Sequence, residues 1–174
     1  MQLKSKRVYL RPLHIDDANG NYPNWLNDKE VCRYNSHGGV LYTKNMAIEY
    51  IKSIQNNSTC KVFAICLNDN SKHIGNISLQ QISQDNKSAE FAILMGEKAF
   101  WGKGFATEAG KLLMKYGFKS LDLNKIYCGT SELNIPMQKL ALNLKMIQKD
   151  VKKNAMKKND KFLDIITYIK VKTK

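Results

Sequence analysis

A segment rich in glycine and other small residues, in the middle of the chain, has the residue types needed to bind an anion. It reads Trp101-Gly102-Lys103-Gly104-Phe105-Ala106-Thr107-Glu108 and lies between a predicted strand and a predicted helix. Glycines at positions 102 and 104 let the backbone approach a ligand closely. The N–H groups of a loop that enters a helix point outward to phosphate oxygens, and the helix dipole assists them. We therefore predict a phosphate-binding loop.

This loop differs from the two familiar phosphate-binding motifs. A Walker loop needs G-x-x-x-x-G-K-[ST], a pattern that the sequence does not contain. A Rossmann loop needs G-x-G-x-x-G in the first βαβ unit, whereas here the third glycine is missing and the loop follows a predicted hairpin in mid-chain. A G-x-G pair before a helix also occurs in ordinary tight turns, so the surrounding elements must decide between the two interpretations.

Hydrophobic periodicity and turn residues predict these elements. Strands are expected at Val8–Pro12, Lys61–Leu67, His73 to about Gln81, Ser88–Met95, Lys125–Ser131 and Phe162 to about Val171. Helices are expected from the caps Asp16 and Asp17 to about Leu26, from Thr43 to about Ile54, from Gly104 to about Leu121, and from Pro136. The order β, α, α, three β, α, β, α, β, β predicts a mixed α/β (α+β) sheet with helices on its faces, as one domain over residues 1–174.

The loop in this context resembles motif A of the GNAT acyl-CoA N-acyltransferases. Their loop reads Q/R-x-x-G-x-G/A, and the chain supplies Gly104 and Ala106 but has Trp101 in place of the usual Gln or Arg. The similarity is strongest to the branch that includes the ribosomal-protein-alanine and spermidine acetyltransferases. It extends in the right order through Arg7–Leu13, Gly75–Leu79, Ser88–Phe91, Asn124–Tyr127 and Phe162–Tyr168.

The resemblance implies a twisted mixed sheet of about seven strands, splayed between the fourth and fifth and flanked by about four helices, with acetyl-CoA as the co-substrate in the opening. Backbone groups of the loop are expected to bind its pyrophosphate, namely those of Trp101, Gly102, Lys103, Gly104, Phe105, Ala106 and Thr107. Ile93, Leu94 and Met95 would pair through their backbone with the pantetheine arm, like an added strand. Asn134, at the family's usual Asn position, would contact the same arm.

Acetyl transfer from a thioester to an amine needs a neutral amine, stabilisation of an oxyanion and a proton for the leaving thiolate. Glu90, beside the apolar Phe91, is the candidate base, and the same residue type appears at this place in several GNAT enzymes. Its alternative role is a glutamate that faces solvent or orients the substrate. A backbone N–H near Leu94 or Met95 would serve as the oxyanion donor.

The general acid departs from the family pattern. Many GNAT enzymes have a Tyr seven residues after the Asn, but this chain has Ala141 there, which excludes a Tyr acid at that site. Water or a hydroxyl such as that of Ser131 could protonate the thiolate instead. His37 lies in the loop that would border the acceptor site and is a candidate substrate contact.

The net charge of +13 indicates an anionic partner. Residues 139–174 hold eleven lysines and three aspartates, so they carry most of this charge. Nucleic acid is an unlikely main partner because this segment has no arginine and the chain shows no helix-turn-helix, zinc-finger or RNP-type pattern.

The remaining composition points to a reducing compartment. The four cysteines have neither C-x-x-C nor zinc spacing, which predicts buried reduced thiols and no metal site. The longest apolar run has six residues, Val62–Leu67, and the N-terminus has no apolar signal region. We therefore expect a cytoplasmic protein with no membrane segment.

Two functions remain open at this stage. The main hypothesis is an acetyl-CoA-dependent N-acetyltransferase that acts on a small-molecule or peptide primary amine, either a nucleotide-linked amino sugar or a protein N-terminus. A polyamine acceptor would gain nothing from a basic surface. A homodimer is an expectation from the family alone. The second hypothesis is a catalytically idle module that binds acyl-CoA or docks to RNA or the ribosome, motivated by Ala141 and Lys145 in place of family residues.

Overall fold

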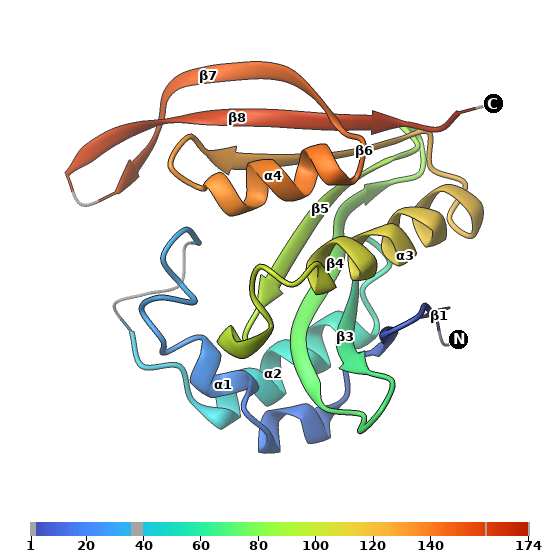
Figure 1. The fold of residues 1–174 in the computed structure, drawn as a ribbon, viewed down its shortest axis with the longest axis vertical. Helices are drawn as coiled ribbons and strands as arrows, with labels where there is room; N and C mark the ends of the chain where they lie inside the picture. The colour runs from blue at the N-terminus through green and yellow to red at the C-terminus, as the bar shows by residue number, and fades with distance from the viewer. Residues whose placement is uncertain (1–2, 36–39, 159, 174) are drawn as a thin grey trace.

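The computed structural model describes residues 3–35, 40–158 and 160–173 (Figure 1). Within these ranges one mixed sheet of eight strands has the spatial order β1-β2-β3-β4-β5-β6-β8-β7. The strands are β1 (Leu3–Lys4), β2 (Val8–Pro12), β3 (Lys61–Leu67), β4 (His73–Ser83), β5 (Ser88–Met95), β6 (Lys125–Ser131), β7 (Ile147–Lys158) and β8 (Lys161–Val171). The short β1, at the sheet edge, adds one strand to the seven that the sequence predicts.

Helices cover both faces of the sheet, which confirms the predicted fold class. They are the 3-10 helices η1 (Ile15–Asn19) and η2 (Lys98–Phe100), and the α-helices α1 (Tyr22–Trp25), α2 (Lys44–Gln55), α3 (Phe105–Lys119) and α4 (Ile135–Asn143). One buried cluster packs α3 and α4 against the sheet, and a second packs α1 and α2 against the opposite face.

The first predicted helix is wrong in extent. Instead of one helix from Asp16 to Leu26, the chain forms η1, capped by His14, and then the single turn α1. The break falls at Gly20, the C-cap of η1, whose backbone is extended. Asp17 does cap η1, as predicted, through a capping box with the His14 backbone, and it is buried. Its carboxylate accepts hydrogen bonds from the Arg11 guanidinium at 2.6 and 2.8 Å and from the His14 backbone N–H at 2.8 Å. Thr43 also caps α2 as predicted, accepting from Met46 N–H at 3.2 Å.

Strands β5 and β6 form the only parallel pair among the described strands, and they separate early. Their pairing is limited to Ser88↔Lys125, Ala89↔Ile126 and Glu90↔Tyr127. Beyond Glu90, β5 runs on to Met95 and β6 runs on to Ser131 without pairing to each other. Figure 1 shows the two strands diverging from this point. The predicted splay between the fourth and fifth expected strands is therefore confirmed.

Side chains of β5 alternate between the two cores, as the pleat of a strand requires. Phe91 is buried in the α3 cluster, where Ile93 and Met95 also pack, whereas Leu94 packs toward α2. The cysteines are free thiols, and Cys32, Cys66 and Cys128 are buried, as the sequence predicts. None of the helices in the described ranges is long and apolar enough to span a membrane.

Candidate active site

The predicted anion loop forms a tight turn at the start of α3. Gly102 has φ +71° and Gly104, the N-cap of α3, has φ +82°. This left-handed region favours glycine because a Cβ crowds the following carbonyl. A Cβ added at Gly102 would meet nothing within 4 Å, so the loop backbone faces open space rather than packed protein. An open backbone at a helix N-terminus, with its oriented N–H groups, is a suitable cradle for a pyrophosphate.

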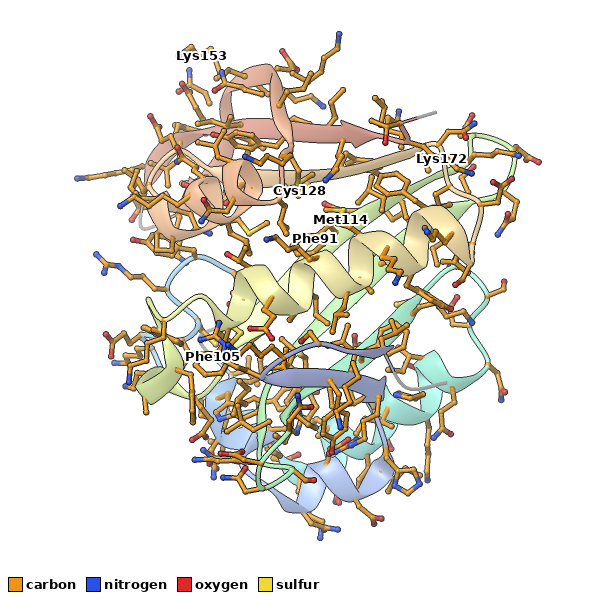
Figure 2. All side chains as sticks on the ribbon, turned by 45° about the vertical axis from the view of Figure 1, so that its right-hand side comes forward. Phe91, Phe105, Met114, Cys128, Lys153 and Lys172 are labelled. Carbon is orange, nitrogen blue, oxygen red and sulfur yellow. The ribbon has the colours of Figure 1, made fainter. Side chains whose placement is uncertain are left out.

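Side-chain contacts hold this loop from both sides. The Trp101 indole Nε1–H donates to Met95 O at 2.8 Å, which ties the loop to the end of β5. On the other side, the Arg7 guanidinium donates to Lys103 O at 3.0 Å and lies 4.3 Å from the centre of the Phe105 ring. Figure 2 labels Phe105 at this end of α3. The family's usual Gln or Arg is therefore replaced by a tryptophan that anchors the loop through its indole.

Arg7 also binds Glu108 in the first turn of α3. Its Nε donates to Glu108 Oε2 at 2.7 Å, while the Arg7 backbone N–H and the Ser5 hydroxyl both donate to Oε1. Burial alone would raise the pKa of the Glu108 carboxyl, but these hydrogen bonds and the guanidinium charge outweigh it and lower the pKa. A carboxylate there also interacts favourably with the helix dipole.

Beyond Glu90, every second residue of β5 directs its backbone N–H and C=O groups into the opening between β5 and β6. Gly96 N–H donates to Ile74 O on β4, in register with the pair Gly75↔Met95. Because backbone groups alternate sides along an antiparallel strand, those of Ile93 and Met95 point away from β4 into the opening, and those of Leu94 point toward β4. Both backbone groups of Ile93 and the N–H of Met95 therefore offer an edge that a pantetheine arm could pair with, whereas Met95 O already accepts from the Trp101 indole.

Glu90 lies where β5 and β6 stop pairing. It is half-buried, and its Oε2 accepts a hydrogen bond from the Gln81 Nε2–H at 3.0 Å. The Tyr127 hydroxyl, across the last β5–β6 pair, donates to Gln81 Oε1 at 3.3 Å. Burial raises the pKa of the Glu90 carboxyl, and no cation among the described residues forms an ion pair with it. A carboxylate with a raised pKa is a stronger proton acceptor.

A cavity of about 580 Å³ opens beside Glu90 on the α1 and α2 face of the sheet. Residues directly opposite on neighbouring strands share a face, and the pairs Ser78↔Ala92 and Gln80↔Glu90 place Glu90 on the cavity side. Its wall is formed by Tyr22, Leu26, Asn35, Tyr42, Tyr50, Ser53, Ile54, Asn57, Thr59, Cys60, Val62, Asn76, Ile77, Ser78, Gln80, Gln81, Ala92, Ile93 and Leu94. None of these residues is acidic or basic.

Three tyrosines from three segments give the cavity its aromatic side. The rings of Tyr22 and Tyr42 are 6.3 Å apart, and Tyr50 comes from α2. Burial raises the pKa of Tyr50 to about 12 and raises that of Tyr22 as well, so both phenols are neutral hydrogen-bonding groups at pH 7. Sequence reasoning did not identify this wall, because its residues are spread over separate segments with no shared motif.

A network of polar side chains leads to Asn76, one of the residues that line the cavity. Arg11 binds the buried Asp17, Asp17 lies 3.4 Å from Nδ1 of His73, and His73 Nε2 lies 2.8 Å from the Asn76 side-chain oxygen. Although burial opposes ionisation of Asp17, hydrogen bonds from Arg11 and His73 lower the pKa of its carboxyl. The network orients Asn76 toward the cavity that it lines.

The other predicted site residues lie at the β6 side of the splay. Asn134 caps α4, with its side-chain oxygen accepting from Met137 N–H at 3.2 Å. Ser131, at the end of β6, is buried, and its hydroxyl oxygen accepts from Leu133 N–H at 3.2 Å. Ala141, on α4, is fully buried. His37 lies outside the described residues. Across the described ranges, no cluster of side chains could hold a metal ion.

Comparisons with known proteins agree with this geometry. Residues 7–147 match the family model described as acetyltransferase (GNAT) domain. An uncharacterised N-acetyltransferase, p20, of Bacillus licheniformis is 29% identical over 95% of this chain and 93% of its own length. The spermidine N(1)-acetyltransferase of Escherichia coli K12 is 33% identical over 69% of this chain and 62% of its own length.

Solved structures show the same fold. A ribosomal α-N-protein acetyltransferase in complex with coenzyme A superimposes with a TM-score of 0.88, at 14% identity, over 98% of both chains. The matching family model covers both the glycine loop and the splayed strands, which are the parts that can bind the cofactor. The chain therefore belongs to the GNAT family and is an acetyl-CoA-dependent N-acetyltransferase.

Proposed function

We propose that the primary amine that accepts the acetyl group enters the tyrosine-lined cavity and that Glu90 is the catalytic base. The observation that carries this proposal is the position of Glu90, at the last β5–β6 pair and on the cavity side of the sheet. A thioester lying in the splay and an amine in the cavity would meet beside this carboxylate. The glycine loop would hold the pyrophosphate end of the same acetyl-CoA molecule.

Each chemical step then has a group that serves it. The Glu90 carboxylate accepts a proton from the ammonium, and the neutral amine attacks the acetyl carbonyl carbon. The N–H of Met95, directed into the opening, donates to the oxyanion. When the C–S bond breaks, the attacking nitrogen loses its extra proton and the thiolate gains one, relayed through water or the Ser131 hydroxyl, because the buried Ala141 cannot supply one.

The cavity chemistry favours an acceptor whose amine-bearing part is polar and otherwise uncharged over a polyamine. A second ammonium on the acceptor would require a carboxylate in the wall, and the wall residues carry none. Neutral amides, hydroxyls and phenols suit a sugar or a peptide, and the net charge of +13 attracts an anion. We therefore place a nucleotide-linked amino sugar first and a protein N-terminus second.

An acceptor panel tests this order. Release of coenzyme A is measured with a nucleotide-linked amino sugar, with peptides that begin with Ala or Ser, and with spermidine, at one acetyl-CoA concentration. We expect kcat/KM to be highest for the amino sugar. If kcat/KM were highest for spermidine, the proposal that the neutral cavity disfavours a polyamine would be contradicted. If no amine caused release of coenzyme A, the proposed acetyl transfer at this site would be refuted.

Substitution of Glu90 tests its role separately. Glu90→Gln is expected to reduce kcat by about 10² to 10⁴-fold with the affinity for acetyl-CoA unchanged. The exposed Glu49→Gln on α2 is the matched control, and it should leave both quantities as they are. Because the active form is the carboxylate, the wild-type rate should rise with pH through the raised pKa of Glu90 and then level off. An unchanged kcat in Glu90→Gln would show that Glu90 is not the catalytic base and would favour its alternative role as a glutamate that faces solvent.

Two broader proposals accompany this function. We propose that residues 1–174 act as one domain, because β7 and β8 lie almost entirely beyond residue 147, where the family match ends, and still extend the sheet. Strand β8 pairs with β6, and β7 pairs with β8. The four free thiols fit a reducing compartment, and we propose the cytoplasm.

A further inference from the structure

A second cavity, separate from the acceptor cavity, lies between α3 and the end of β8. Its volume is about 360 Å³, within the range of about 300 to 1,000 Å³ typical of small-molecule sites. Ten residues line it: Lys111, Met114, Lys115, Phe118, Lys119, Leu144, Lys170, Val171, Lys172 and Thr173. Five of the ten are lysines, and none is acidic.

The lysines reach this cavity from two elements that are distant in sequence. Lys111, Lys115 and Lys119 follow one another at intervals of four residues and so form a single stripe along α3. Lys170 lies near the end of β8, and Lys172 is the first residue after the strand. Two separate parts of the chain therefore direct ammonium groups to the same place.

Most of this positive charge has no carboxylate partner among the described residues. Among the described residues, Asp122 is the carboxylate that pairs here, and it binds Lys172 and Lys87, each at 2.7 Å. The ion pairs found in the described ranges involve none of Lys111, Lys115, Lys119 and Lys170.

Crowding of the ammonium groups affects Lys170 directly. Its Nζ donates to Leu144 O at 2.6 Å. Burial and the nearby charges of Lys111 and Lys145 lower the pKa of its ammonium. Like charges four residues apart on a helix also destabilise the helix. An arrangement that costs stability in the free protein would be relieved by a bound anion.

Apolar side chains complete the lining. Met114, Phe118, Leu144 and Val171 lie among the lysines, and Phe118 is the one aromatic residue of the wall. The combination suits a ligand with several negative charges and a flat or apolar body. Along α3, at 1.5 Å per residue, the cavity lysines Lys111 and Lys119 lie about 9 Å and about 21 Å from Phe105 at the glycine loop. Figure 2 shows this separation, with Phe105 at one end of α3 and Lys172 near the other.

We propose that this cavity, named here the lysine cavity, is a second ligand site that binds a nucleoside polyphosphate, independently of the acetyl-CoA in the splay. The phosphates lie against Lys111, Lys115, Lys170 and their neighbours, and the base contacts Phe118. A single strand of nucleic acid fits less well, because the wall offers only one aromatic ring for stacking, that of Phe118.

Calorimetric titration of ATP into the protein saturated with acetyl-CoA tests the site. Saturation occupies the glycine loop, so that added ATP reports other sites. The test variant is Lys111→Gln/Lys115→Gln, whose side chains are exposed on α3. The control is Lys149→Gln/Lys152→Gln on β7, which removes the same charge from exposed positions outside the cavity wall. Tripolyphosphate and single-stranded RNA of two lengths are titrated in parallel.

We expect one ATP per chain, weakened about tenfold or more in the test variant and unchanged in the control, with tripolyphosphate weaker than ATP. Four results would overturn the proposal. They are no ATP binding in the saturated protein, equal weakening in both variants, equal affinity for ATP and tripolyphosphate, and RNA that displaces ATP with an affinity that rises with length. The last result would identify a nucleic-acid surface instead.

Discussion

The two ends of helix α3 offer anion sites of opposite kinds. At the N-terminal end, backbone N–H groups of the glycine loop face open space, and the only requirement on the side chains is that they hold the loop. At the C-terminal end, the backbone has no free N–H groups to offer, and five lysine side chains supply the charge. The first arrangement depends on backbone geometry and the second on the amount of charge.

This difference has consequences for how each end responds to change. A site made of backbone N–H groups loses its affinity for the anion when one residue cannot adopt the required φ angle, because all the N–H donors of the loop then shift together. A lysine site loses affinity in steps as charges are removed, and salt screens it. The two ends also differ in internal compensation, since Glu108 at the first is paired with Arg7, whereas Lys111 and Lys115 at the second have no partner among the described carboxylates.

Of the changes at the two ends of α3, Gly104→Val is expected to have the largest effect. A β-branched residue at φ +82° costs about 1 to 3 kcal/mol, and the added Cβ would also come within 3.4 Å of an Arg7 guanidinium nitrogen. We expect affinity for acetyl-CoA to fall at least tenfold, measured by calorimetry. Gly20→Ala, at a glycine with negative φ whose nearest neighbour would lie at 3.5 Å, is the control and should bind normally. Normal binding by both variants would refute the backbone site.

Arg7 provides the second test, of how the loop is held. Arg7→Gln removes the bond to Lys103 O, the ion pair with Glu108 and the contact with Phe105. We expect acetyl-CoA affinity to fall about tenfold and the free energy of unfolding to fall by about 1 kcal/mol. The loss of stability is this small because the Arg7 side chain is partly exposed and water screens its ion pair. Arg7→Lys should recover little, since a lysine cannot make the forked contacts. Full recovery would mean that charge alone matters.

Glu108 tests the same end through pH. Its folded pKa lies below the ordinary value of 4.5, so it stabilises the fold above about pH 4.5, and this contribution is lost as the pH falls through the lowered folded pKa. We expect Glu108→Gln to lower the free energy of unfolding at pH 7 by about 1 kcal/mol and to flatten its decline below pH 4.5. Urea unfolding across pH 3 to 7 measures both, and parallel curves for variant and wild type would contradict the assignment.

The smallest expected effect is at the lysine end. Without ligand, Lys111→Gln/Lys115→Gln should raise the free energy of unfolding by about 0.2 to 0.5 kcal/mol at low salt, because it removes repulsion along α3. The gain should vanish at high salt. The control Lys149→Gln/Lys152→Gln should give a smaller change. Destabilisation of the test variant would indicate that these lysines stabilise the free protein.

Much of the fold was predictable because local patterns agree with the final structure. Thr43 begins α2, Gly104 begins α3, and the strands from Lys61 to Met95 lie where alternation and turns put them. The ion pair of Asp17 with Arg11 was not predictable, because Arg11 lies in the preceding strand and outside the helix pattern. The two-residue β1 is too short to carry a periodic signal.

The residues of the candidate active site also fall into a predictable and an unpredictable group. The glycine loop and Glu90 are contiguous features that the sequence and its family resemblance mark directly. The acceptor wall is not, since Tyr22, Tyr42 and Tyr50 come together only when α1, the following segment and α2 pack on the sheet. Gln81 was also missed, because its contact with Glu90 depends on the register irregularity between β4 and β5 around residues 80 to 83.

The sequence by itself therefore determined the family, the cofactor and the position of the loop, because these depend on backbone conformations that neighbouring residues specify. Tertiary structure alone decided the side-chain composition of the two cavities. The neutral wall beside Glu90 and the lysine cavity at the far end of α3 each collect residues from segments far apart in the chain. Their local charge, unlike the net charge of +13, exists only once the sheet and helices have packed.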